Sequence, residues 1–144
     1  MAKFEASVMI DRPVEEVWKF VTDLSKLPKW NTEVQEAKQT SAGPIGVGTT
    51  LQTKSRNMVG YIQVVEYEPN KKITIEFTSR PLKGTNETST VENVEGKTRF
   101  TRTTDMKFSG VYKLVGPFLT PRMKREYIAT VGNLKRILES EVKQ

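Results

Sequence analysis

Apolar and polar residues alternate along most of the chain, the pattern of strands that bury one face. The alternation is loose over residues 4–10 and cleanest over residues 72–78. The same pattern predicts further strands over 34–40, 49–56, 61–67, 85–94 and 98–108. Connections rich in Gly, Pro and Asn separate these segments, and residues 57–60 are expected to form a hairpin turn.

Helical spacing replaces alternation near the two ends of the sequence. After Pro13, apolar residues favour a helix over 14–21, and a second short helix is expected over 23–30, interrupted at Pro28. A long amphipathic helix is predicted over 112–142, with Gly116-Pro117 and Pro121 breaking or kinking its beginning. Its apolar residues recur every three or four positions, at Met123, Tyr127, Val131, Leu134 and Leu138.

The order of these elements predicts an α+β fold in one domain over residues 1–144. One strand and two short helices come first, a run of strands follows, and one helix long enough to cover a small sheet comes last. A curved antiparallel sheet that wraps around such a helix tends to enclose a pocket between the two. The layout therefore predicts a container for a ligand.

Composition narrows the chemistry that this container can perform. The 144 residues are 36% hydrophobic and 28% charged, as in an ordinary globular protein. No apolar run approaches the ~20 residues of a membrane span, and the first residues do not resemble a secretory signal, so a cytoplasmic location without stable membrane insertion is expected. The chain has no Cys and no His, which excludes Ser-His-Asp and Cys-His catalysis and metal sites built on either residue. The net charge of +6 is compatible with nucleic acid, an anionic membrane surface or simple solubility.

Three segments carry a resemblance to a known superfamily. The first is residues 10–18 (IDRPVEEVW), followed by Asp23 and by 27–30 (LPKW). The second is 46–49 (GVGT), leading to 65–73 (VEYEPNKKI), and the third is 96–98 (GKT) together with 134–139 (LKRILE). In this order they resemble the START-like helix-grip (SRPBCC) superfamily, and most closely its polyketide cyclase/dehydrase and lipid-transport group.

The resemblance implies a curved seven-stranded antiparallel sheet around the long C-terminal helix, with two short helices after the first strand. It also implies a cavity that binds a hydrophobic or amphipathic small molecule, lipid- or polyketide-like. Some members catalyse cyclisation or dehydration, but no catalytic signature of the family matches this chain, so no catalytic residue, metal or cofactor is assigned. A third hypothesis, from the chaperone-activator branch, is a protein-interaction module. The oligomeric state stays open.

One set of residues is predicted to line the cavity, because these positions share the inward phase of the strands and of the last helix. The alternative is that the same side chains fill a solid core, but the small residues Thr53, Ser55 and Thr104 favour a cavity. The predicted ligand-binding residues are Leu51, Ile75, Phe77, Phe100, Arg102, Thr104, Met106, Met123, Tyr127, Val131 and Leu134, and Phe108 has the same phase.

Arg102 is the most informative member of this set, because a buried guanidinium needs a partner. Glu66, in phase with neighbouring apolar residues, and Glu87 are the candidate partners within the chain. The interpretations are capture of a ligand carboxylate, a structural ion pair, or a phase error of one residue that places Arg102 in solvent. The structural interpretations are slightly favoured. Tyr127 could hydrogen-bond a ligand, act as a weak general acid, or simply fill the core.

The basic residues of the last helix have a simpler interpretation. They are interspersed with its apolar positions, and no aromatic platform for stacking bases lies among them. A solvated helix face is therefore expected, with no nucleic-acid partner, and an anionic membrane surface is a secondary hypothesis. The residues are Arg122, Lys124, Arg125, Lys135 and Arg136.

Overall fold

The chain folds as one antiparallel sheet with helices on one of its faces. The computed structural model describes residues 2–31, 34–55, 58–80, 82–107 and 112–140. Seven strands pair in the order β1-β7-β6-β5-β4-β3-β2, and all pairs are antiparallel. The strands are β1 (Ala2–Ile10), β2 (Glu36–Gln39), β3 (Thr50–Ser55), β4 (Met58–Glu68), β5 (Lys72–Phe77), β6 (Asn86–Val94) and β7 (Lys97–Met106). The predicted α+β helix-grip architecture is confirmed.

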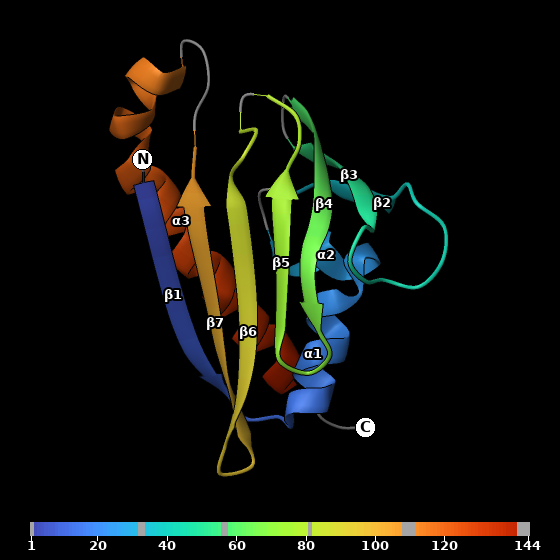
Figure 1. The fold of residues 1–144 in the computed structure, drawn as a ribbon. Coiled ribbons are helices and arrows are strands. Elements are labelled where there is room, and N and C mark those ends of the chain that lie inside the picture. Colours follow the sequence, from blue (N-terminus) through green and yellow to red (C-terminus); the bar gives the residue numbers. More distant parts are fainter. Residues whose placement is uncertain (1, 32–33, 56–57, 81, 108–111, 141–144) are drawn as a thin grey trace.

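The helices cover the concave face of the sheet (Figure 1). They are α1 (Val14–Thr22), the 3-10 turn η1 (Leu24–Lys26), α2 (Leu27–Trp30) and α3 (Tyr112–Ser140). The long α3 runs behind β1 and β7, while α1 and α2 lie toward the β4 side (Figure 1). The first turns of α3 extend past the end of β1, at the same end of the molecule as the connection between β5 and β6 (Figure 1).

The expectations about proline hold only in part. Residues 23–30 do form two pieces, η1 and α2, but the interruption comes just before Pro28, which lies in the first turn of α2, where a missing backbone N–H costs nothing. Pro117 and Pro121 do not break α3, which is one helix from Tyr112 to Ser140, so the expected break is absent. Proline fixes φ close to the helical value, so it weakens a helix through a lost hydrogen bond without excluding helical geometry.

The expected turn over residues 57–60 is also wrong in the part that the structure describes. β4 already begins at Met58 and continues through Gly60, which pairs with Thr53 of β3. A Cβ at Gly60 would lie 3.3 Å from the Thr53 hydroxyl oxygen, so a residue without a side chain suits this close pairing. Asn57 lies outside the described residues.

A β-bulge in β4 decides which of its residues face the helices. The register between β4 and β5 shifts between Val64 and Glu66. Beyond the bulge, Tyr67 points inward and its ring lies 5.7 Å from that of Trp18 on α1. Glu66 is consequently exposed on the outer face, where the Thr74 hydroxyl donates a 2.8 Å hydrogen bond to it. The prediction that Glu66 could be an internal partner of Arg102 is therefore wrong, because the bulge inverts the alternation.

The core lies between the inner face of the sheet and the helices. Ile10 of β1, Val64 of β4 and Phe100 of β7 are fully buried and pack in one cluster with Val17 of α1 and Leu134 of α3. The outer face of the sheet is polar, and hydroxyl pairs such as Ser7 with Thr101 connect neighbouring strands there. One face of the sheet is thus available for a ligand site, and α3 covers it on the β1 and β7 side (Figure 1).

Candidate functional site

The eleven residues predicted to line a cavity all lie on the helix side of the sheet or on α3. Eight are buried and three are half-buried. Phe100, Val131 and Leu134 belong to the main core cluster, whereas Met106 and Tyr127 form a second cluster with Phe4, against which Met123 and Leu82 pack. The buried residues are Leu51, Phe100, Arg102, Thr104, Met106, Tyr127, Val131 and Leu134, and the half-buried ones are Ile75, Phe77 and Met123. Phe108 lies outside the described residues.

Arg102 points inward and is only 5% exposed, so the phase predicted for β7 is correct. Its Nη2 donates a 2.7 Å hydrogen bond to Oε1 of Glu87 on β6, one of the two partners predicted. Glu87 lies opposite Thr104 in the pairing of β6 with β7, one inward position away from Arg102. Burial lowers the pKa of the guanidinium, but the neighbouring Glu87 carboxylate offsets this effect, and the pKa lies above its ordinary value.

Two aromatic rings enclose the same guanidinium. Its central carbon lies 4.7 Å from the ring centroid of Tyr127 and 5.5 Å from that of Trp30, within the range of cation–π contacts. Trp30 also meets Phe100 edge to face, with the centroids 6.2 Å apart. The indole Nε1 of Trp30 is buried and has no hydrogen-bond partner among the residues that the structure describes. Trp30 is thus a core residue of α2 that leaves one polar atom unsatisfied beside the buried ion pair.

Tyr127 connects the helix to the sheet through its hydroxyl group. Oγ1 of Thr104 donates a 2.8 Å hydrogen bond to the phenol oxygen, and both side chains are buried. Burial raises the pKa of Tyr127 well above its ordinary value, although the Arg102 charge and the Thr104 hydrogen bond act in the opposite direction. The phenol therefore stays protonated at neutral pH and can serve as a hydrogen-bonding group, not as a base.

A small cavity lies on the inner face of the sheet, beside β3, β4 and β5. Its volume is about 50 Å³. Of the eleven predicted residues only Phe77 lines it, together with Thr53 and Ser55, the small residues expected to leave room. The other lining residues are Met58, Gly60, Ser79, Arg80 and Leu82. The sequence signal for this cavity was the small side chains of Thr53 and Ser55 at alternate positions of β3, where Thr53 pairs with Gly60.

A second hollow lies at the opposite end of the molecule. It has a volume of about 600 Å³ and is lined by the turn between β4 and β5, by β6 and by the start of α1. Most of its lining residues are exposed and charged or polar, such as Glu15, Glu68 and Lys71. Its polar, open character does not match a site for an apolar ligand. Within the described ranges, no group of three acidic side chains is placed to hold a metal ion.

A curved sheet gripping a long C-terminal helix, with buried polar groups between them, defines this molecule as a START-like helix-grip protein. The family model described as "Polyketide cyclase / dehydrase and lipid transport" matches residues 1–139. The chain belongs to this family, which confirms the resemblance seen in the sequence. No curated protein matches the chain.

Solved structures share the fold at low sequence identity. TTHA0849 from Thermus thermophilus is 14% identical with a TM-score of 0.82, and the match covers 99% of this chain and 100% of that one. The Aha1 dimer from Colwellia psychrerythraea is 18% identical with a TM-score of 0.75, covering 99% and 100%. The di-domain ARO/CYC protein BexL, from the BE-7585A biosynthetic pathway, is 14% identical with a TM-score of 0.74, covering 94% of this chain and 46% of that one. These similarities establish the fold.

Proposed function

We propose that this protein binds a hydrophobic or amphipathic small molecule, lipid- or polyketide-like, between its sheet and α3. The observation that carries the proposal is the cavity on the inner face of β3, β4 and β5, whose lining comes from these strands and from the connection after β5, so it must extend toward α3 to reach the helix. Apolar side chains (Met58, Phe77 and Leu82) line it together with small polar ones such as Thr53 and Ser55. Mostly apolar lining with a few polar groups is typical of small-molecule sites.

The cavity must enlarge before it holds such a ligand. Its volume of about 50 Å³ suits one or two water molecules, whereas ligand pockets commonly measure about 300–1,000 Å³. Leu82 offers the route for enlargement, because it lines the cavity and also packs against the cluster of Phe4, Met106 and Tyr127. Displacing Leu82 would bring the cavity into contact with the packed cluster of Met106, Tyr127 and Met123, three of the predicted ligand-binding residues.

The buried ion pair favours a ligand that is mainly apolar. Glu87 already neutralises Arg102 at 2.7 Å, so a ligand carboxylate would have to displace Glu87 or leave a net negative charge buried. Of the interpretations of Arg102 considered above, the structural ion pair accords best with this geometry.

Mass spectrometry tests the proposal directly. Protein purified without detergent should show, under native conditions, a defined extra mass that is lost on denaturation. Ser55→Leu should abolish the extra mass and the uptake of an apolar fluorescent probe such as anilinonaphthalene sulfonate, because the added carbons fill the cavity. Ser7→Leu is the matched control, since the same substitution on the outer face of β1 leaves the cavity unchanged.

Three results would decide against this function. Equal uptake by the wild type and Ser55→Leu would show that the ligand does not occupy this cavity. A clean mass without probe uptake, together with a protein partner that co-purifies stably, would favour the interaction-module hypothesis. The third result would be that the protein converts a bound small molecule chemically. If Tyr127→Phe abolished that conversion but kept binding, the result would favour the cyclase or dehydratase hypothesis.

A further inference from the structure

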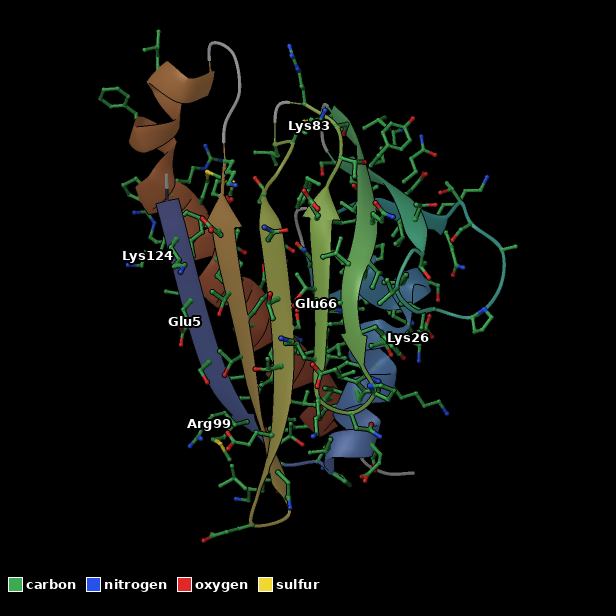
Figure 2. The ribbon with its side chains drawn as sticks, in the orientation of Figure 1. Glu5, Lys26, Glu66, Lys83, Arg99 and Lys124 are labelled. Carbon is green, nitrogen blue, oxygen red and sulfur yellow. The ribbon has the colours of Figure 1, made fainter. Side chains whose placement is uncertain are left out.

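Cationic residues gather at the end of the molecule where the small cavity lies. The connection from β5 to β6 carries Arg80 and Lys83, both exposed, and residues 78–85 include no Asp or Glu. Figure 2 shows Lys83 pointing outward from this end. Lys107, also exposed, follows β7, and its side chain passes close to Gly84 of the same connection. Residues 107–125 contain five basic residues and no acidic one.

The opposite end of the molecule has a mixed charge. The connection after β1, the turn between β4 and β5 and the turn between β6 and β7, with the strand residues that flank them, contain acidic and basic residues together: Asp11, Glu68, Glu95, Arg12, Lys71, Lys72 and Lys97. The two segments named near the cavity, 78–85 and 107–125, thus carry seven basic residues and no acidic one, whereas the turns at the opposite end carry both signs. An uneven distribution of this kind orients a protein toward an anionic surface.

Large apolar side chains are exposed at the same end. Phe118 is 85% exposed and Leu114 is 75% exposed, and they lie one helical turn apart on the same face of α3. Met58 and Val59, at the start of β4, are each exposed by more than 40%. The first turns of α3, which hold Leu114 and Phe118, extend past the end of β1 (Figure 1). Leu114 and Phe118 thus form an exposed apolar pair on one face of α3, and such a pair indicates a surface that is covered in another state.

We propose that this end of the protein docks on an anionic lipid membrane. The docking surface consists of Leu114 and Phe118 on α3, Arg80 and Lys83 between β5 and β6, and Lys107. Aromatic and aliphatic residues beside Lys and Arg are the composition of helices that lie in a membrane interface. The apolar side chains enter the boundary of the acyl chains, while the cations meet anionic headgroups.

Charge decides between a membrane and a second copy of this chain as the occupant. A symmetric dimer through this end would bring the same basic residues of two protomers together, and that repulsion opposes association. Arg122 lies one turn after Phe118 and is exposed, and its Nε lies 3.5 Å from the Glu126 carboxylate, so its apolar stem can lie along the interface beside this surface ion pair. An anionic bilayer matches both the charge and the apolar character of the surface. The proposal holds whether or not the cavity is filled.

Sedimentation with lipid vesicles tests this surface. The purified full-length protein should bind phosphatidylcholine vesicles that contain phosphatidylserine, bind pure phosphatidylcholine vesicles far more weakly, and lose affinity as salt rises. Arg80→Ala/Lys83→Ala should weaken binding by about 30-fold, since each basic residue at such a surface contributes roughly one kcal/mol. Phe118→Ser should weaken binding by at least about tenfold, because its ring no longer enters the apolar boundary.

Matched controls separate docking from general effects of the substitutions. Lys71→Ala/Lys97→Ala removes two exposed cations from the opposite end, and Val47→Ser replaces a 70% exposed apolar residue in the loop between β2 and β3. Both control variants should bind like the wild type, and circular dichroism should show that every variant is folded. Equal binding to the two kinds of vesicle, or wild-type binding by Phe118→Ser, would overturn the proposal. If the protein does not bind vesicles but forms a dimer that Phe118→Ser dissociates, the proposal would be overturned in favour of self-association.

Discussion

The guanidinium of Arg102 and the carboxylate of Glu87 meet 2.7 Å apart inside the protein, in a space closed by two aromatic rings. The side chain of Arg102 is 6% exposed and that of Glu87 is 19% exposed, so little water screens the pair. Removing one member of such a pair leaves an uncompensated buried charge, which costs more than the pair itself contributes.

We expect Glu87→Gln to destabilise the protein by about 3 kcal/mol, because Arg102 then keeps its charge without a counter-ion. The double variant Arg102→Met/Glu87→Leu should be much closer to the wild type, since it removes both charges and keeps apolar volume. Urea denaturation followed by tryptophan fluorescence measures both, because Trp18 and Trp30 are buried.

A double variant as unstable as Glu87→Gln would show that the ion pair itself, and not the avoided lone charge, stabilises the fold. Glu92→Gln is the matched control, because its ion pair with Arg99 lies on the exposed outer face. Such exposed pairs contribute less than about 1 kcal/mol.

Tyr127 provides a prediction at alkaline pH. Its pKa is raised in the folded protein by burial, so the folded state holds the phenol proton above the ordinary pKa of 10.0, at which the unfolded chain releases it. Stability from this group is therefore complete below about pH 10 and falls as pH rises toward the folded pKa, by about 1.4 kcal/mol per pH unit. Tyr127→Phe cannot lose this proton, so its stability should fall less steeply in that range.

The same substitution should lower stability at neutral pH. It removes the acceptor of the Thr104 hydrogen bond and leaves that buried hydroxyl unsatisfied, at a cost of about 1–2 kcal/mol. Thr104→Val removes the hydroxyl that has lost its acceptor. The double variant Tyr127→Phe/Thr104→Val should therefore be more stable than Tyr127→Phe alone. Parallel pH dependence of the wild type and Tyr127→Phe above pH 10 would contradict the burial of the phenol.

The fold was predictable because its signals are local. Alternation over 72–78 and the helical recurrence that includes Tyr127 and Leu134 each lie within one segment, and the structure confirms both. What alternation cannot reveal is a change of pairing between strands. The bulge between Val64 and Glu66 inverts the facing of later residues in β4, so Glu66 was placed on the wrong side.

The candidate site was predictable only in part. The inward phase of Arg102 and its possible pairing with Glu87 follow from alternation in β7 and β6, and the structure shows both. The cavity, by contrast, depends on how Gly60 pairs with Thr53 and on where the loop carrying Leu82 returns. These are contacts between distant segments, which single-segment patterns do not encode. A ligand role for the eleven predicted residues stays a prediction.

Glu139, near the end of α3, contacts the residues that follow β1. Its Oε2 accepts hydrogen bonds of 2.8 Å from Nζ of Lys135 and from the backbone N–H of Asp11, and Nη2 of Arg12 donates to its carbonyl oxygen. The hydrogen bond from Lys135 is the largest cause of a pKa below the ordinary value of 4.5, followed by that from Asp11. The carboxylate thus connects α3 to the segment between β1 and α1.

We expect Glu139→Gln to lower stability at neutral pH by less than about 1 kcal/mol, because the group is partly exposed. A depressed folded pKa means that this contribution is present above about pH 4.5 and is lost as pH falls through the folded pKa. The difference between wild type and Glu139→Gln should therefore shrink between pH 7 and about pH 3, as measured by urea denaturation at each pH. Glu15→Gln, at an exposed position of α1, is the control for general charge effects. A difference of the same size at pH 7 and at pH 3 would contradict this prediction, because it would show that the charge of Glu139 does not contribute to stability.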